Sequence, residues 1–158
     1  VVRLVGSEMC IRDRDIGVFG HGYTYTGHPV SCAVALKTLE IYERDKVFQH
    51  AKKVGEYFQN SIKEILKEDY VGEVRGIGLI AGIELYKDPL NKIAFEEAGK
   101  AGKILSDTCQ KNGLIVRPIL DTVALCPPLI ISEKEVDELT DKLKKSLQEA
   151  KDEIIKIH

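Results

Sequence analysis

VGEVRGIGLIAGIELY, residues 71–86, is the stretch that decides the fold. It is rich in Val, Ile and Leu, and glycines interrupt it at positions 72, 76, 78 and 82. A run of this composition, interrupted by glycine, is typical of two short strands joined by a tight turn. The stretch therefore predicts a β-hairpin.

Helical patterns lie on both sides of this hairpin. Pro29 suits the first turn of a helix over residues 30–45, because its missing N–H is one that the first turn leaves unpaired. A second helix is predicted over 47–68, where apolar residues recur at three- and four-residue steps. A third is predicted over 94–111, ended by Gly113. Ser132 and Glu135 form an S-x-x-E capping box that starts a last helix.

Two further strands, residues 114–119 and 122–128, are predicted to pair around a polar turn at Asp121. Strands paired with their sequence neighbours and separated from the helices favour an α+β fold over a doubly wound sheet. We therefore expect a small, mostly antiparallel sheet with helices packed on one face. The 44% hydrophobic and 30% charged residues are typical of a folded domain.

Three segments are expected along the chain. Residues 1–14 show no helical or strand periodicity, and we interpret them as a leader that is non-native or disordered. Residues 15–46 hold a glycine-rich loop and a linking helix, and residues 47–158 form the α+β domain.

Composition excludes several classes of function. The net charge is −2, from 23 Lys and Arg against 25 Asp and Glu, with no basic cluster, so no nucleic acid is expected as a partner. No apolar run approaches the length of about 20 residues that crosses a bilayer, and we expect a cytoplasmic protein with no membrane partner. No CxxC pair occurs among the four cysteines, Cys10, Cys32, Cys109 and Cys126. We therefore expect neither a structural metal site nor a disulfide framework, and we expect the thiols to be free and buried.

The loop before Pro29 carries the strongest local signal for a ligand. Gly20, Gly22 and Gly27 allow backbone N–H groups to approach a ligand closely, and the hydroxyl of Thr24 adds a donor. This combination suits a phosphate, although glycine and threonine before a helix are also typical of a plain turn and cap. Metal binding by the two histidines of this loop, at 21 and 28, is not expected, because no carboxylate or thiolate lies at a helpful spacing.

Three segments in order resemble one enzyme family. HGYTYTGHPVSCAVALKTLEIYE, residues 21–43, resembles the HG-x-T-Y-[ST]-GHP segment of class III aminotransferases, which are pyridoxal-phosphate enzymes of fold type I. VRGIGLIAGIEL at 74–85 is similar to the family's RG-x-GL stretch. NGLIVRP and VALCPPLIIS, within 112–132, are similar to its C-terminal strands.

The resemblance implies the C-terminal portion of a transaminase that moves an amino group between an amine or amino acid and a keto acid. It implies pyridoxal 5'-phosphate as cofactor, with its phosphate held by Thr24 and by backbone N–H groups around Gly22 and Tyr23. Arg117 would bind the substrate carboxylate, and Arg75 is interpreted as structural. In such enzymes the loop reaches the active site of the neighbouring subunit, so the resemblance also implies a homodimer.

No catalytic residue is predicted within this chain. The resemblance places the reactive lysine before the glycine-rich loop. The candidate lysines of this chain lie instead on predicted helices: Lys37, Lys52, Lys53, Lys63 and Lys67. We therefore expect the fragment to be inactive alone. An aminomutase or decarboxylase of the same fold is an alternative. So is a non-catalytic interaction module, whereas the G-x-G-x-x-x-G spacing in the hairpin argues against a dinucleotide fingerprint.

Overall fold

The computed structural model describes Gly17 and residues 24–157 of the chain. It divides into two compact units, residues 1–41 and 42–158. In the first unit a turn over residues 24–27 leads into helix α2 (Pro29–Arg44), which starts at the predicted proline. Thr24 and the residues of α2 up to Glu40 are exposed.

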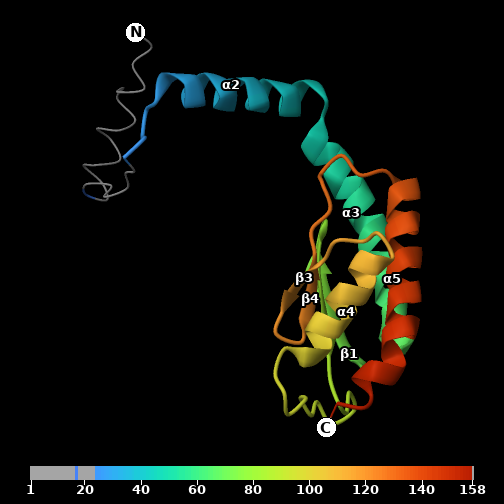
Figure 1. Ribbon diagram of the computed structural model, residues 1–158. Coiled ribbons are helices and arrows are strands. Elements are labelled where there is room, and N and C mark those ends of the chain that lie inside the picture. The colour runs from blue at the N-terminus through green and yellow to red at the C-terminus, as the bar shows by residue number, and fades with distance from the viewer. Residues whose placement is uncertain (1–16, 18–23, 158) are drawn as a thin grey trace. The chain divides into compact units, whose positions relative to one another are not determined.

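The second unit holds the predicted sheet (Figure 1). Its four strands lie in the order β1-β2-β4-β3, and every neighbouring pair is antiparallel. This arrangement confirms the expected α+β class. The elements follow in the order α3 (Val47–Lys63), η1 (Glu64–Lys67), β1 (Val71–Ile77), β2 (Ile80–Leu85), α4 (Lys100–Lys111), β3 (Arg117–Ile119), β4 (Thr122–Leu125) and α5 (Glu133–Ile154).

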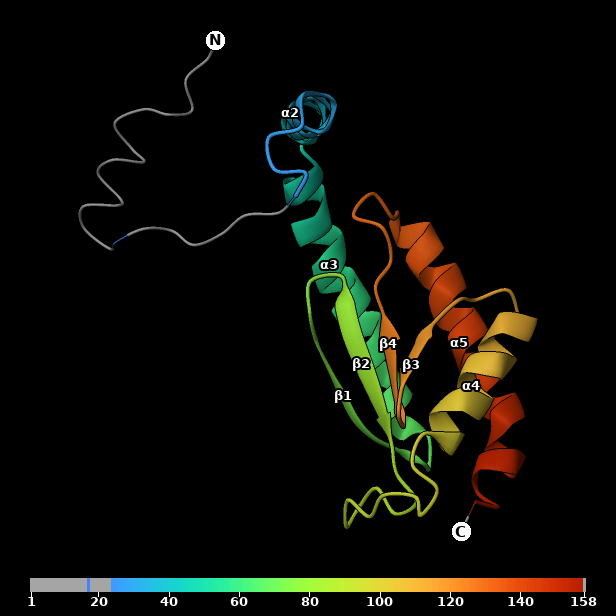
Figure 2. The ribbon, with the colours of Figure 1, turned by 60° about the vertical axis from the view of Figure 1, so that its left-hand side comes forward.

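Helices cover one face of this sheet (Figure 2). Helix α3 packs on β1, α4 packs on β3 and β4, and α5 packs on α3 and α4. Ala81, Ile83 and Leu85 alternate along β2 as buried residues and point to the helices, as the period of two along a strand requires. They join one core with the fully buried side chains of the helices, which include Phe58, Ile62, Leu105, Leu143 and Leu147.

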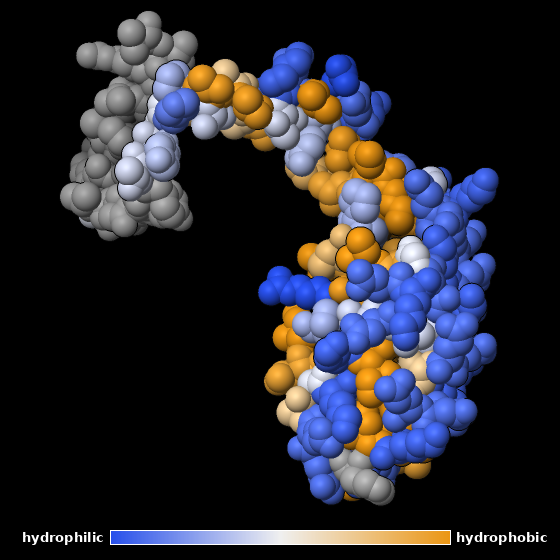
Figure 3. Space-filling view, viewed as in Figure 1, coloured by the Kyte–Doolittle hydropathy of each residue, from blue (hydrophilic) through white to orange (hydrophobic). Residues whose placement is uncertain are grey.

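The capping box predicted at the start of α5 is confirmed. The backbone N–H of Glu135 donates to Ser132 Oγ at 3.3 Å, and the Glu135 carboxylate accepts from the Ser132 backbone N–H at 2.8 Å. These two bonds pair donors that the first helical turn would otherwise leave free. Hydrophilic side chains gather along the exposed side of α5 (Figure 3).

Two predicted helices and two predicted strands are longer than those in the structure. Helix α4 begins at Lys100 and not at Ala94, because Gly99 takes a left-handed φ of 85° and Phe95 lies in the core. Helix α3 ends at Lys63, and a 3-10 turn continues it only to Lys67. The two strands around Asp121 cover only 117–119 and 122–125 of the predicted 114–119 and 122–128.

Helix α3 and the β1–β2 hairpin meet backbone to backbone. A Cβ atom added to Gly55 would lie 2.8 Å from Gly78 Cα, closer than real side chains come. Gln59, one turn further along α3, donates from Nε2 to the carbonyl oxygens of Gly78 at 2.8 Å and Ile80 at 3.0 Å. The helix therefore fixes the hairpin turn in place.

The expectation of buried thiols is only partly correct. Cys109 is buried, whereas Cys32 and Cys126 are exposed, and Cys10 lies outside the described residues. Burial raises the pKa of the Cys109 thiol, which favours the inert, protonated form. None of the helices that the structure describes is long and apolar enough to cross a membrane.

Candidate functional site

The predicted phosphate loop lies in the first unit. Gly22 and Tyr23 fall outside the described residues, whereas Thr24 begins the exposed turn over 24–27. Gly27 takes a left-handed φ of 76°, which a residue with a side chain rarely adopts. The backbone N–H of His28 donates to the carbonyl of Tyr25 at 3.2 Å and closes the turn. The turn delivers the chain directly to the start of α2.

The chemistry of this turn fits a phosphate group. The first turn of α2 contains no acidic residue, so no carboxylate there would repel an anion. The start of a helix carries a partial positive charge and unpaired backbone N–H groups. The Thr24 hydroxyl adds a donor on an exposed turn. Among Gly17 and residues 24–157, no three His, Cys, Asp or Glu side chains gather as a metal site would require.

Arg117 lies in the second unit, on the sheet face opposite the helices. Residues paired across neighbouring strands point to the same face, and Arg117 pairs with Ala124, Ala124 with Gly82, and Gly82 with Arg75. These four residues form a row across the sheet, which we call the arginine row. It has one guanidinium at each end and two small residues between them.

The two arginines of this row differ in their partners. Arg75 forms ion pairs with Glu84 and, at 3.8 Å, with Glu73. The Glu84 carboxylate, as the largest cause, raises the pKa of the Arg75 guanidinium. Arg117 is exposed and has neither an ion pair nor a hydrogen bond from its side chain to any residue in the described part of the chain. Within Gly17 and residues 24–157, Arg117 is therefore the guanidinium of this row without a charged partner.

Asp121 holds the strand of Arg117 in position. Its carboxylate accepts the backbone N–H groups of Gly99 at 2.9 Å and Gly102 at 3.1 Å, both at the start of α4. A Cβ atom at Gly102 would overlap the carbonyl oxygen of Leu120, so the β3–β4 turn lies directly on the helix backbone. Leu120 itself takes a left-handed φ of 52° in this turn. A helix end thus anchors the hairpin that carries Arg117.

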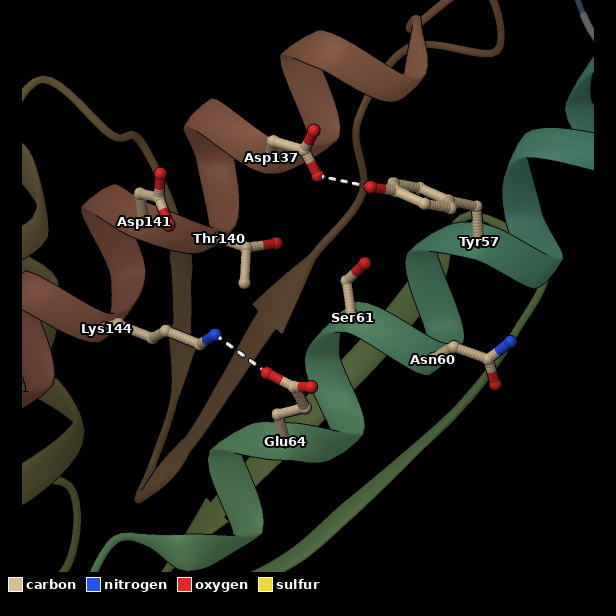
Figure 4. Close-up of a pocket in the computed structure, with 8 residues that line it drawn as sticks. All are labelled: Tyr57, Asn60, Ser61, Glu64, Asp137, Thr140, Asp141 and Lys144. Carbon is tan, nitrogen blue, oxygen red and sulfur yellow. Dashed lines mark hydrogen bonds and ion pairs between the residues drawn. The ribbon is translucent and has the colours of Figure 1, made fainter.

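A separate polar pocket of about 310 Å³ lies between α3 and α5 (Figure 4). Two interactions cross it: Tyr57 donates to Asp137 at 2.5 Å, and Lys144 pairs with Glu64 at 3.0 Å. No residue predicted as part of a site lines it. Its polar side chains join the two helices at the surface, and we assign it a structural role.

Sequence reasoning missed Glu84 and Asp121. Glu84 stands in an alternating strand pattern, and its pairing with Arg75 depends on the register of the hairpin. The sequence predicts Asp121 only as a turn residue, because its contact with α4 joins residues 19 and 22 positions apart. The structural interpretation of Arg75 agrees with its ion pairs.

Comparison with known proteins identifies the family. The model of the aminotransferase class-III family matches residues 6–147. A probable gamma-aminobutyrate transaminase 3, mitochondrial, of Oryza sativa subsp. indica is 37% identical over 142 residues, which are 90% of this chain and 28% of that protein. The chain therefore spans less than a third of the length of this curated relative.

Solved structures of transaminases are similar to this chain as well. A structure described as a transaminase with L-ala has a TM-score of 0.81 and 38% identity, over 95% of this chain and 35% of its own. The omega transaminase from Pseudomonas jessenii in complex with PMP has a TM-score of 0.80 and 34% identity, over 92% of this chain and 32% of its own. The order of strands and helices, the glycine-rich turn before α2 and these matches have one explanation: the chain belongs to the class-III aminotransferases.

Proposed function

We propose that this chain is the C-terminal portion of a pyridoxal-phosphate-dependent transaminase that moves an amino group between an amine or amino acid and a keto acid. The observation that carries the proposal is Arg117 of this family member, a guanidinium without a partner among the described residues, on the sheet face opposite the helices. A planar guanidinium pairs with both oxygens of one carboxylate, which a lysine cannot reproduce. Arg117 would hold the carboxylate of the keto acid.

Thr24 would hold the phosphate of the cofactor, together with backbone N–H groups around Gly22 and Tyr23. The exposed turn, the nearby helix start and the lack of an acidic residue there support this role. Pyridoxal phosphate, when bound, supplies an electron sink that the amino acid side chains of a protein lack. Thr24 and the amides would fix where it sits, and Arg117 would orient the acceptor.

The lysine that carries the cofactor would come from outside residues 15–158. We propose that these residues alone transfer no amino group, and that the phosphate loop serves the neighbouring subunit of a homodimer. A cofactor absorbance band in the isolated chain that borohydride abolishes, with a modified lysine found by mass spectrometry, would contradict the first statement. The cytoplasmic location remains a prediction, and the rice relative is named as mitochondrial.

Arg117→Ala tests the carboxylate role in the polypeptide extended to the length of its relatives. KM for keto acids should rise, because the bidentate pair is lost, whereas KM for simple amines without a carboxylate should stay unchanged. Arg117→Lys should recover only part of the loss. The control is Arg44→Ala, which removes the exposed last residue of α2, an arginine that pairs with Asp45. Equal effects on both substrate classes would refute the role.

A further inference from the structure

We propose that Glu84 is a positioning residue: it holds Arg75 in an ion pair, so that Arg117 is the one guanidinium of the arginine row left free to receive a carboxylate. The inference rests on the proposed role of Arg117. It also assigns a substrate preference to this face. With Glu84 in place, only Arg117 is free, and the arginine row favours anions with a single carboxylate. Without the charge of Glu84, Arg75 would be free as well, and the row would accept a dicarboxylate.

The geometry of the row places the two arginines at its ends. Neighbouring strands lie about 4.8 Å apart, so three strand steps separate Arg75 and Arg117 by roughly 14 Å between Cα atoms. Gly82 and Ala124 between them carry no atom beyond Cβ. Both long side chains can therefore extend over the row without meeting another side chain of the row.

The charges decide which end is available. Two carboxylates, Glu73 and Glu84, face each other across β1 and β2, which would be unfavourable without a cation between them. Arg75 lies next to both, and Lys92 also reaches Glu73 at 3.4 Å. This cluster of two acids and two bases has no net charge. An approaching anion is therefore attracted to the Arg117 end alone.

Glu84 is the stronger of the two acidic partners of Arg75. It accepts a hydrogen bond from the guanidinium, and its side chain is 29% exposed, against 39% for Glu73. Glu73 lies 3.8 Å from Arg75 and is shared with Lys92. A change at Glu84 is therefore expected to release Arg75, whereas a change at Glu73 is not.

The test follows the guanidinium Nε signals of the two arginines by nitrogen NMR in this chain, at low salt, during titration with sodium butyrate or sodium glutarate. In the unmodified chain the Arg117 signal should move with both anions, and the Arg75 signal should stay fixed. In Glu84→Gln the Arg75 signal should move with glutarate. The apparent affinity for glutarate relative to butyrate should rise about two- to fivefold, the range expected from one additional exposed ion pair.

Two further variants separate this effect from a general loss of negative charge. Glu138→Gln on α5 removes the same charge from an exposed pair with Lys142 and should leave the anion preference unchanged. Arg75→Gln combined with Glu84→Gln should abolish the glutarate gain and keep butyrate binding, which would assign the gain to Arg75. Amide spectra of each variant check that the fold is intact.

Three results would overturn the inference. An Arg75 signal that already moves with glutarate in the unmodified chain would show that Glu84 does not hold it. An Arg75 signal that stays fixed in Glu84→Gln, while Arg117 responds, would refute the role of Glu84 and leave that of Arg117 intact. An Arg117 signal that ignores butyrate would count against this inference and the proposed function together.

Discussion

Asp121→Ala should remove the anchor between the β3–β4 turn and the start of α4. The carboxylate accepts two backbone N–H groups, at 2.9 and 3.1 Å, that no residue of their own helix can satisfy. Loss of an N-cap acceptor costs about 1 kcal/mol and at most about 2. Because two bonds are lost at a partly buried position, we expect the free energy of unfolding to fall by about 1.5–2 kcal/mol.

Thermal unfolding followed by circular dichroism measures this loss. The unfolding entropy of a unit of this size is about 0.25 kcal/mol/K, so Tm should fall by roughly 6–8 °C. Asp121→Asn keeps one carbonyl oxygen and should lose about half as much. Asp107→Ala, which removes an exposed pair with Lys103 on the same helix, should change stability by less than about 0.5 kcal/mol. If Asp121→Ala and Asp107→Ala unfold at the same temperature, the anchor does not exist in solution.

Three further changes test other parts of the chain. Leu120→Gly should raise Tm, because a left-handed φ of 52° costs a leucine about 1 kcal/mol that glycine avoids; a lower Tm would contradict the turn geometry. The Tyr70 hydroxyl donates to the carbonyl of Leu147 at 2.5 Å, and burial raises the pKa of this phenol. The tyrosine of the unfolded chain ionises above about pH 10, whereas the buried phenol stays neutral. The free energy of unfolding should therefore fall as pH rises above about 10. Tyr70→Phe should cost about 1 kcal/mol at neutral pH and reduce that alkaline loss; an unchanged alkaline slope would argue against a neutral buried phenol. Thr24→Ala in the full-length polypeptide should weaken cofactor binding by about tenfold or more, measured by equilibrium dialysis, since a bond to a charged phosphate contributes about 1.5–3 kcal/mol; equal affinity would remove Thr24 from the site.

Local signals were sufficient for much of the fold. Pro29 and the Ser132–Glu135 box each start a helix as predicted, because both act through backbone groups within one turn of the chain. The glycine-punctuated stretch 71–86 forms the predicted hairpin for the same reason. These features need no information from distant residues.

The start of α4 could not be predicted because a distant contact decides it. Residues 94–98 favour a helix locally, but Phe95 is buried in the core and the helix begins only where Asp121 accepts its first N–H groups. The site shows the same limit. The family resemblance points to Arg117, whereas the ion pair of Glu84 with Arg75 depends on the register of the hairpin.

The glycine contact between α3 and the hairpin restricts how this domain can change shape. Packed elements usually shift past each other by small rotations of the side chains between them. Here Gly55 and Gly78 leave no such layer. The helix and the hairpin should therefore move as one block.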